Sequence, residues 1–126
     1  MLTLIVTTLL AAPPAAKPVD ARAEHIRSHY AKSEHRVPMR DGTHLFTSVY
    51  VPNYRSKTYP VLLLRTPYRV APYGANQYRK RLGPTADFEK AGYIFVFQDV
   101  RGRFMSEGKF EHMRPHGGKT NEATDT

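Results

Sequence analysis

The stretch "PVLLLRTPYRV" (residues 60–70) decides how this chain is interpreted. Its first part is apolar through Leu64 and does not alternate, which is typical of a strand covered on both faces in an α/β sheet. The sequence then changes to an arginine, a threonine, a proline and a tyrosine, and residues 66–81 have the composition of a long loop. A loop that follows directly on a core strand is a common place for functional side chains, so Tyr68 becomes the first candidate.

A helix and a second buried strand follow this loop. Residues 84–91, "PTADFEKA", have a proline near the start, acidic residues in the first turns, and Gly92 directly after the end, all of which favour a helix. Residues 93–98, "YIFVFQ", are again apolar without alternation. The order strand, helix, strand predicts a parallel pair joined by a right-handed crossover.

Upstream of residue 60, the pattern is that of a β-hairpin over residues 35–51. The turn is predicted at Arg40-Asp41-Gly42, because Gly accepts the positive φ that such turns need. After the turn, apolar and polar residues alternate, as in a strand with two unlike faces. A hairpin that leads into a strand-helix-strand unit predicts the α/β class, with a mixed sheet.

The first 34 residues differ from the rest of the chain. Residues 2–12 are apolar and no charge precedes Lys17, so residues 1–20 are interpreted as a signal peptide or a disordered lead. A signal peptide would place the protein outside the cytoplasm, secreted or periplasmic; otherwise a cytoplasmic location is expected. The apolar run is too short to span a bilayer. Residues 21–34 have helix-compatible spacing and are expected to form a helical or irregular lead-in.

The composition excludes disulfides and argues against metal sites. The 126 residues include no cysteine, which excludes disulfides and thiolate metal sites. His25 and His29 are four residues apart on a predicted helix, but no third ligand is evident. His112 and His116 have the same spacing but lie in a predicted loop, so no metal and no cofactor are predicted.

The formal net charge of +8 leaves nucleic-acid binding open as an alternative, since tyrosines and arginines interleave over residues 65–81. Against it, the basic residues are spread along the chain and the two apolar strands carry no aromatic-basic alternation.

Four segments carry a family resemblance: "RDGTHLFTSVYVP" (40–52), "PVLLLRTPY" (60–68), "AGYIFVFQDVRGRFMSEGKF" (91–110) and "MRP" (113–115). In this order they resemble the N-terminal part of the X-prolyl dipeptidyl peptidase and cocaine-esterase-like branch of the α/β-hydrolases, and within it the α-amino acid ester hydrolases and related acylases. The resemblance implies that residues 35–126 are the N-terminal portion of a peptidase S15-like domain. It also implies a serine hydrolase whose substrates are small esters, amides or peptides.

The resemblance assigns a role to Tyr68. In this family a tyrosine just after the third strand, in an Arg-Thr-Pro-Tyr context, lends its hydroxyl to the oxyanion hole, and residues 65–68 match that context. In α/β-hydrolases generally, one oxyanion donor comes from the loop after the third strand. A tyrosine that packs on the sheet rim is the structural alternative. Asp99 and Arg101 follow the second buried strand, where a catalytic role for Asp99 is one interpretation. We expect instead that Asp99 pairs with an arginine and braces the loops, and that residues 106–108 form a turn.

The nucleophile of such an enzyme is missing from the sequence. Acyl transfer on this fold uses a serine in a Gly-x-Ser-x-Gly turn, and none of the serines fits that frame: Ser28, Ser33, Ser48, Ser56 and Ser106. We therefore expect an N-terminal fragment that is inactive alone, whose incomplete sheet leaves a face or edge of "YIFVFQ" exposed. The alternative is a small stand-alone binding or regulatory protein.

Overall fold

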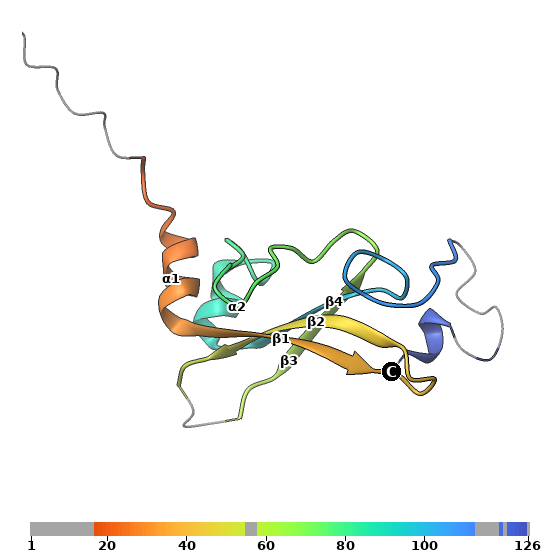
Figure 1. Ribbon diagram of the computed structural model, residues 1–126. Helices are drawn as coiled ribbons and strands as arrows, with labels where there is room; N and C mark the ends of the chain where they lie inside the picture. The colour runs from red at the N-terminus through yellow and green to blue at the C-terminus, as the bar shows by residue number, and fades with distance from the viewer. Residues whose placement is uncertain (1–16, 55–57, 113–118, 120, 126) are drawn as a thin grey trace, which may run out of the picture.

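The computed structural model describes residues 17–54, 58–112, 119 and 121–125, and Figure 1 shows their arrangement. The elements are α1 (Ala21–His29), β1 (Tyr30–Pro38), β2 (His44–Pro52), β3 (Val61–Thr66), α2 (Ala86–Ala91), β4 (Ile94–Asp99) and a 3₁₀ turn, η1 (Glu122–Thr124). The four strands form one sheet in the order β1-β2-β4-β3. β2 pairs antiparallel with both β1 and β4, whereas β3 and β4 are parallel. The predicted α/β class, with a hairpin joined to a parallel pair, is confirmed.

The first strand begins earlier than the sequence predicts. Residues 30–34, expected in the lead-in, belong to β1, which pairs with β2 from Tyr30↔Pro52 to Pro38↔His44. The cause is tertiary. The Tyr30 side chain is buried, its ring packs 5.9 Å from that of Phe95, and its hydroxyl donates to the Glu89 carbonyl at 2.8 Å. Packing of this kind overrides the local helix propensity. The lead-in is therefore helical only over α1.

The main core lies on one face of the sheet, below the two helices and the loop that joins β3 to α2 (Figure 1). It consists of Ile26, Tyr30, Phe46, Tyr50, Val70, Leu82, Phe95 and Phe97. The β3–α2 loop is fixed over this face by Lys32 of β1, whose side chain is fully buried. The Lys32 ammonium lies 2.8 Å from each of three loop carbonyls, those of Pro72, Gly74 and Gln77, and 2.7 Å from the Glu34 carboxylate.

Strand β3 corrects one expectation. Its apolar sequence predicts a strand covered on both faces, but β3 is the edge of the sheet, and Val61 and Leu63 are each 58% exposed. A groove of about 300 Å³ runs beside it, between Leu64, Leu82 and Phe95. The apolar run shows that both faces of β3 are suited to burial, but it does not show which neighbours are present. Within the described residues, β4 is the only strand that pairs with β3.

The expectation for "YIFVFQ" is wrong for the edge, whereas the face that carries Ile94 and Val96 is only half-buried. β4 lies between β2 and β3, and its Phe95 and Phe97 are 2% and 3% exposed. The reason is the strand order: the crossover places the later strand on the inner side of the parallel pair, so the earlier strand becomes the edge. In the described part of the chain, no helix is long and apolar enough to cross a membrane. Residues 1–16 lie outside the described residues, and the proposed signal peptide with them.

Candidate active site

The candidate site lies where β3 and β4 end side by side. Thr66 and Asp99 are register partners at the carboxyl ends of the two parallel strands. The turn of residues 66–70 leaves β3 there, and the loop of residues 100–110 leaves β4. In open α/β sheets this edge is where ligands bind. The structure therefore brings the loop with Tyr68 next to the loop with the "DVRGR" sequence.

Tyr68 is presented to solvent from a fixed turn. Its side chain is 82% exposed, and its hydroxyl has no hydrogen-bond partner among the described residues. The backbone around it is held on three sides. The Tyr68 N–H donates to Thr66 Oγ1 at 3.0 Å, the Val100 N–H donates to the Thr66 carbonyl at 3.3 Å, and Arg103 Nε donates to the Pro67 carbonyl at 3.4 Å. A free phenol on a fixed backbone suits a hydrogen-bond donor to a bound group.

Ser106 lies in the same region but is not placed as a nucleophile. Its hydroxyl donates to the Asp99 carbonyl at 2.6 Å and accepts from the Phe46 N–H at 2.8 Å. Both of these bonds are structural, and neither partner is a base. Ser106 thus ties the β4 loop to β2. The turns of this loop lie within residues 101–105 rather than at residues 106–108 as expected, where only Gly108 bends the chain.

Asp99 braces the loops, as expected, but not through an arginine. Its carboxylate is fully buried and accepts from the Val70 N–H at 3.0 Å and from the Tyr73 hydroxyl at 2.8 Å. Burial and this hydrogen bond raise the pKa of Tyr73 to about 12. Both donors come from the β3–α2 loop, a contact that no local spacing in the sequence indicates.

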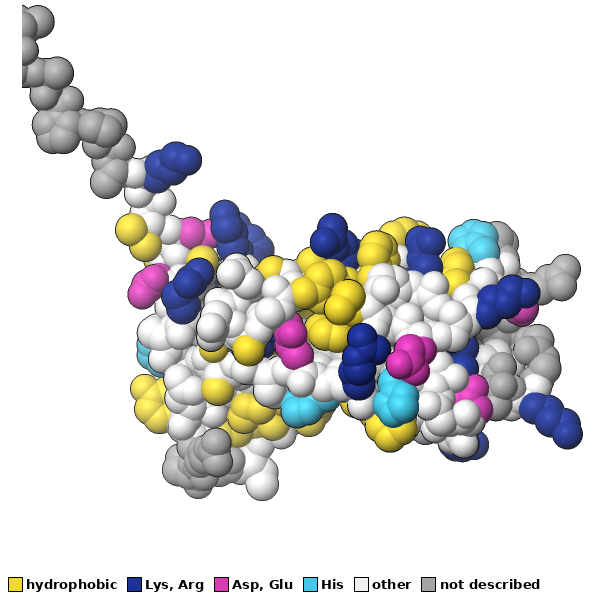
Figure 2. Space-filling model, in the orientation of Figure 1, with side chains coloured by type: hydrophobic (Ala, Val, Ile, Leu, Met, Phe, Trp, Pro, Cys, Tyr) yellow, Lys and Arg dark blue, Asp and Glu magenta, His cyan; other side chains and the backbone are white. Residues whose placement is uncertain are grey.

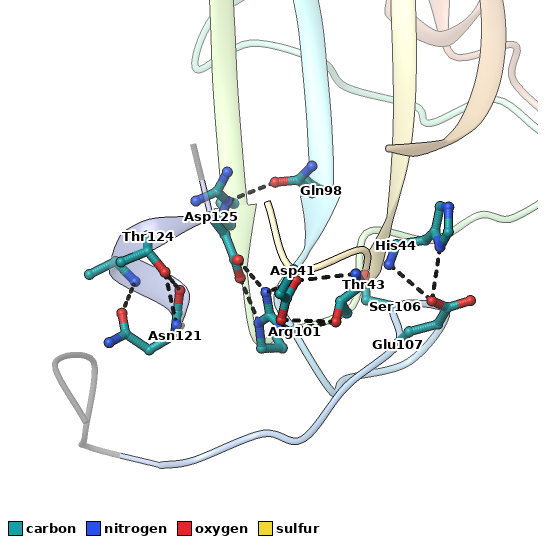
Figure 3. Close-up of polar contacts among 12 residues, drawn as sticks. Asp41, Thr43, His44, Gln98, Arg101, Ser106, Glu107, Asn121, Thr124 and Asp125 are labelled. Carbon is teal, nitrogen blue, oxygen red and sulfur yellow. Dashed lines mark hydrogen bonds and ion pairs between the residues drawn. The ribbon is translucent and has the colours of Figure 1, made fainter. Parts of the chain in front are cut away.

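Arg101 pairs with two other carboxylates (Figure 3). Its guanidinium binds Asp41 at 2.6 and 3.1 Å and Asp125 at 2.5 and 3.0 Å. It therefore joins the hairpin turn, the β4 loop and the end of η1. The hydrogen bond from Arg101 is the main reason that the pKa of Asp41 falls to about 2.

The β4 loop is tightly built, and glycine is required at one point. Gly102 has φ +68, and a Cβ there would lie 2.1 Å from the Phe110 nitrogen. The next contact along the loop is Glu107, whose carboxylate accepts from the His44 N–H at 2.9 Å and lies 3.1 Å from His44 Nδ1. These hydrogen bonds, led by that from the backbone N–H, lower the pKa of Glu107.

The other candidate groups lie away from this edge. The His25 and His29 rings are stacked at 4.1 Å on α1. The described residues contain no group of three His, Cys, Asp or Glu side chains that could hold a metal ion. His116, of the second histidine pair, lies outside the described residues.

One arginine of residues 65–81, the segment considered for nucleic-acid binding, makes its contacts within the protein. Arg79 Nη1 donates to the carbonyls of Val70 and Ala71 at 3.1 and 2.9 Å, and its guanidinium lies 4.4 Å from the centre of the Phe97 ring. On the face drawn in Figure 2, basic side chains are interspersed with acidic ones rather than gathered in one patch.

Comparison with known proteins identifies the family. Residues 41–126 match the X-Pro dipeptidyl-peptidase (S15 family). The chain belongs to this family. It is 38% identical over 90 residues to a cocaine esterase of Rhodococcus sp. (strain MB1 Bresler), a match that covers 71% of this chain and 15% of that protein. The resemblance drawn from the four sequence segments is thereby confirmed.

Solved structures of related hydrolases share the fold of this S15-family chain. An α-amino acid ester hydrolase superposes with a TM-score of 0.61 at 32% identity. An aminopeptidase from a marine sediment archaeon, Thaumarchaeota archaeon, gives 0.59 at 26%. Each match covers 94% of this chain and 20% of the solved one. The chain therefore spans one fifth or less of the length of these relatives.

Proposed function

We propose that residues 35–126 form the N-terminal part of the catalytic domain of a serine hydrolase that cleaves ester or amide bonds, and that Tyr68 supplies one oxyanion donor. The observation that carries this proposal is the free, 82% exposed Tyr68 on a fixed turn at the carboxyl end of β3, in a chain of the S15 family. None of the five serines lies in a Gly-x-Ser-x-Gly frame. We therefore propose that the nucleophile belongs to a segment outside these 126 residues, and that the chain alone is inactive.

The chemistry follows from the charge that develops in acyl transfer. When a serine attacks an ester or amide, the carbonyl oxygen becomes negative, and donors aimed at it lower the barrier. The Tyr68 hydroxyl can donate one hydrogen bond, and a backbone N–H near the serine would supply the other. Because the turn of residues 66–70 is already ordered, little reorganisation is needed when the charge forms. Losing one such donor costs a factor of about 10²–10³ in kcat.

The proposed substrates are small esters, amides or peptides. The support is the set of proteins that this chain resembles, which includes an esterase, an ester hydrolase and an aminopeptidase. A free amino group on the acyl part would fit the resemblance to the α-amino acid ester hydrolases. The uncharged apolar run of residues 2–12 supports a secreted or periplasmic location.

The test is a chimaera in which residues 41–126 replace the matching segment of the Rhodococcus cocaine esterase. On a p-nitrophenyl ester, Tyr68→Phe is expected to lower kcat by about 10²–10³ with a small change in KM, since the lost bond forms mainly in the transition state. Tyr54→Phe is the control, because Tyr54 is also exposed but lies beyond the opposite end of the sheet, after β2. The same exchange in the α-amino acid ester hydrolase provides a second host. An unchanged kcat in a folded Tyr68→Phe chimaera would overturn the role of Tyr68.

The inactivity of the 126-residue chain is tested separately with the same ester. No turnover above the buffer rate is expected. Turnover that Tyr68→Phe abolishes would show that the chain carries its own nucleophile, contrary to the proposal.

A further inference from the structure

We propose that Asp99 is a positioning residue for Tyr68: its carboxylate fixes the turn that presents the tyrosine hydroxyl at the carboxyl end of β3. This inference rests on the proposed function, because it concerns how the oxyanion donor is held. Asp99 is fully buried, and it acts through the backbone of residues 68–70.

The contacts of Asp99 lie on both sides of Arg69, the residue after Tyr68. One carboxylate oxygen accepts from the Val70 N–H at 3.0 Å, and the other accepts from the Tyr73 hydroxyl at 2.8 Å. Between Tyr68 and Val70 stands Arg69, whose guanidinium lies 5.5 Å from the centre of the Tyr73 ring. Asp99 thus holds both the amide that follows Arg69 and the ring on which Arg69 rests.

The backbone at Arg69 shows why such a hold is needed. Arg69 has φ +46, in the left-handed region that a residue with a Cβ seldom adopts. Strain of this kind persists only where the surrounding structure imposes it, and it is found mainly at functional sites. The bend at Arg69 directs the chain from the exposed Tyr68 to the buried Val70 within two residues. Releasing the Val70 N–H would let this bend relax, and the Tyr68 ring would move with it.

A carboxylate suits this position better than a neutral side chain. Asp99 is fully buried, and its described donors are two neutral groups at hydrogen-bond distance and a longer contact from the Met105 N–H at 3.5 Å. An ionised carboxylate accepts at both oxygens, whereas asparagine has a single acceptor oxygen. The β4 loop is attached mainly through the backbone, since the Ser106 hydroxyl binds the Asp99 carbonyl at 2.6 Å. Asp99→Asn therefore weakens the Tyr68 side of the site and spares the β4 loop.

The first test measures the turn in the 126-residue chain. In Asp99→Asn the Val70 amide is expected to exchange its hydrogen about tenfold faster, because its acceptor is weakened or lost. Amides of the β1–β2 ladder, such as that of Ser33, serve as the internal reference. An unchanged Val70 exchange rate, relative to this reference, would overturn the proposal.

The second test is a double-mutant cycle in the active chimaera. Asp99→Asn is expected to lower kcat about tenfold with Tyr68 present and to have little effect in the Tyr68→Phe background, since residues that act as one unit are not additive. Asp41→Asn is the matched control: it perturbs another loop carboxylate at the same edge, and its effect is expected to add to that of Tyr68→Phe.

The outcomes separate the two proposals. If Tyr68→Phe lowers kcat but the effect of Asp99→Asn simply adds to it, Asp99 is a structural brace and the inference fails while the proposed function stands. If Tyr68→Phe leaves kcat unchanged in a folded chimaera, the proposed function fails first.

Discussion

Two buried carboxylates flank strand β4, and they are held in opposite ways. Glu89, in α2 before the strand, is bound by the Arg22 guanidinium at 2.7 and 2.8 Å and by two backbone N–H groups, those of Leu82 and Gly83. Asp99, at the end of the strand, is held by neutral donors. The Glu89 end joins α1 to α2 through a full ion pair and closes the core. The Asp99 end shapes a loop whose tyrosine remains free.

The two ends differ in whether strain and exposure are retained beside the buried carboxylate. Burial alone would raise the pKa of Glu89, but the hydrogen bonds from Arg22 and from the two amides outweigh it, and the pKa is lowered. At the other end, a strained Arg69 and an 82% exposed Tyr68 are retained. The Glu89 end is therefore held by a closed ion pair, whereas the Asp99 end, besides the ion pairs of Arg101, retains strain and exposure.

The largest expected effect comes from breaking the Glu89 cluster. Glu89→Ala leaves the partly buried Arg22 and the Leu82 and Gly83 amides without their acceptor, and we expect a loss of about 3–5 kcal/mol of unfolding free energy. Urea unfolding followed by circular dichroism measures it. Glu24→Ala, an exposed glutamate on α1, is the control and should change stability by a few tenths of a kcal/mol. Equal losses in the two variants would contradict a stabilising role for the Glu89 cluster.

Arg101→Ala is expected to have the next largest effect. It leaves Asp125, which is 1% exposed, as a buried carboxylate without its cation, at a cost of about 3 kcal/mol. Arg101→Lys should recover only part of the loss, because an ammonium cannot bind two carboxylates in the forked geometry of a guanidinium. The measurement is again the urea midpoint. Full recovery by lysine would show that charge alone, without geometry, holds the three segments together.

Acid should destabilise the protein, chiefly between about pH 4 and pH 2. The pKa of Asp41 falls to about 2 when folded, and that of Glu89 is also lowered. In this range the unfolded chain binds more protons than the folded one, so stability is present above the unfolded pKa and is lost as the pH falls through the folded pKa. Urea midpoints at pH 6, 4 and 2.5 measure this effect. Asp41→Asn should flatten the decline, and an equally steep decline in that variant would exclude Asp41 as a cause.

The smallest effect on stability is expected from Tyr68→Phe. The hydroxyl has no partner among the described residues, so the unfolding free energy should change by no more than about 0.5 kcal/mol. Thermal unfolding of the two chains side by side measures it. A Tyr68→Phe variant that is clearly less stable would mean that the hydroxyl serves the fold, and would weaken its assignment to catalysis.

Much of the fold could be predicted from local signals. The turn at Asp41-Gly42, the helix start after Pro84 and the helix end at Gly92 each follow from backbone preferences of one or two residues. The candidate site could be located because Tyr68 lies where an apolar run changes to loop residues. These features depend on neighbours in the sequence, so the sequence reports them directly.

What could not be predicted depends on contacts between distant residues. The early start of β1 needs the contact of Tyr30 with Glu89, 59 residues away. The pairing of Asp99 with the Val70 amide joins residues 29 positions apart. The exposure of β3 depends on which strands lie beside it, and its own residues do not reveal that. The expectation that Asp99 pairs with an arginine was wrong for the same reason, since Arg101 binds Asp41 and Asp125 instead.

The buried Lys32 has a consequence for how the loop before α2 keeps its shape. Its ammonium lies among three backbone carbonyls and a carboxylate, an oxygen-rich shell of the kind that a calcium ion gathers in other proteins. Here the cation is covalently part of the chain. We therefore expect the order of this loop to be independent of calcium and unaffected by chelators. The loop needs no bound ion to take its shape, because the Lys32 ammonium already occupies the position.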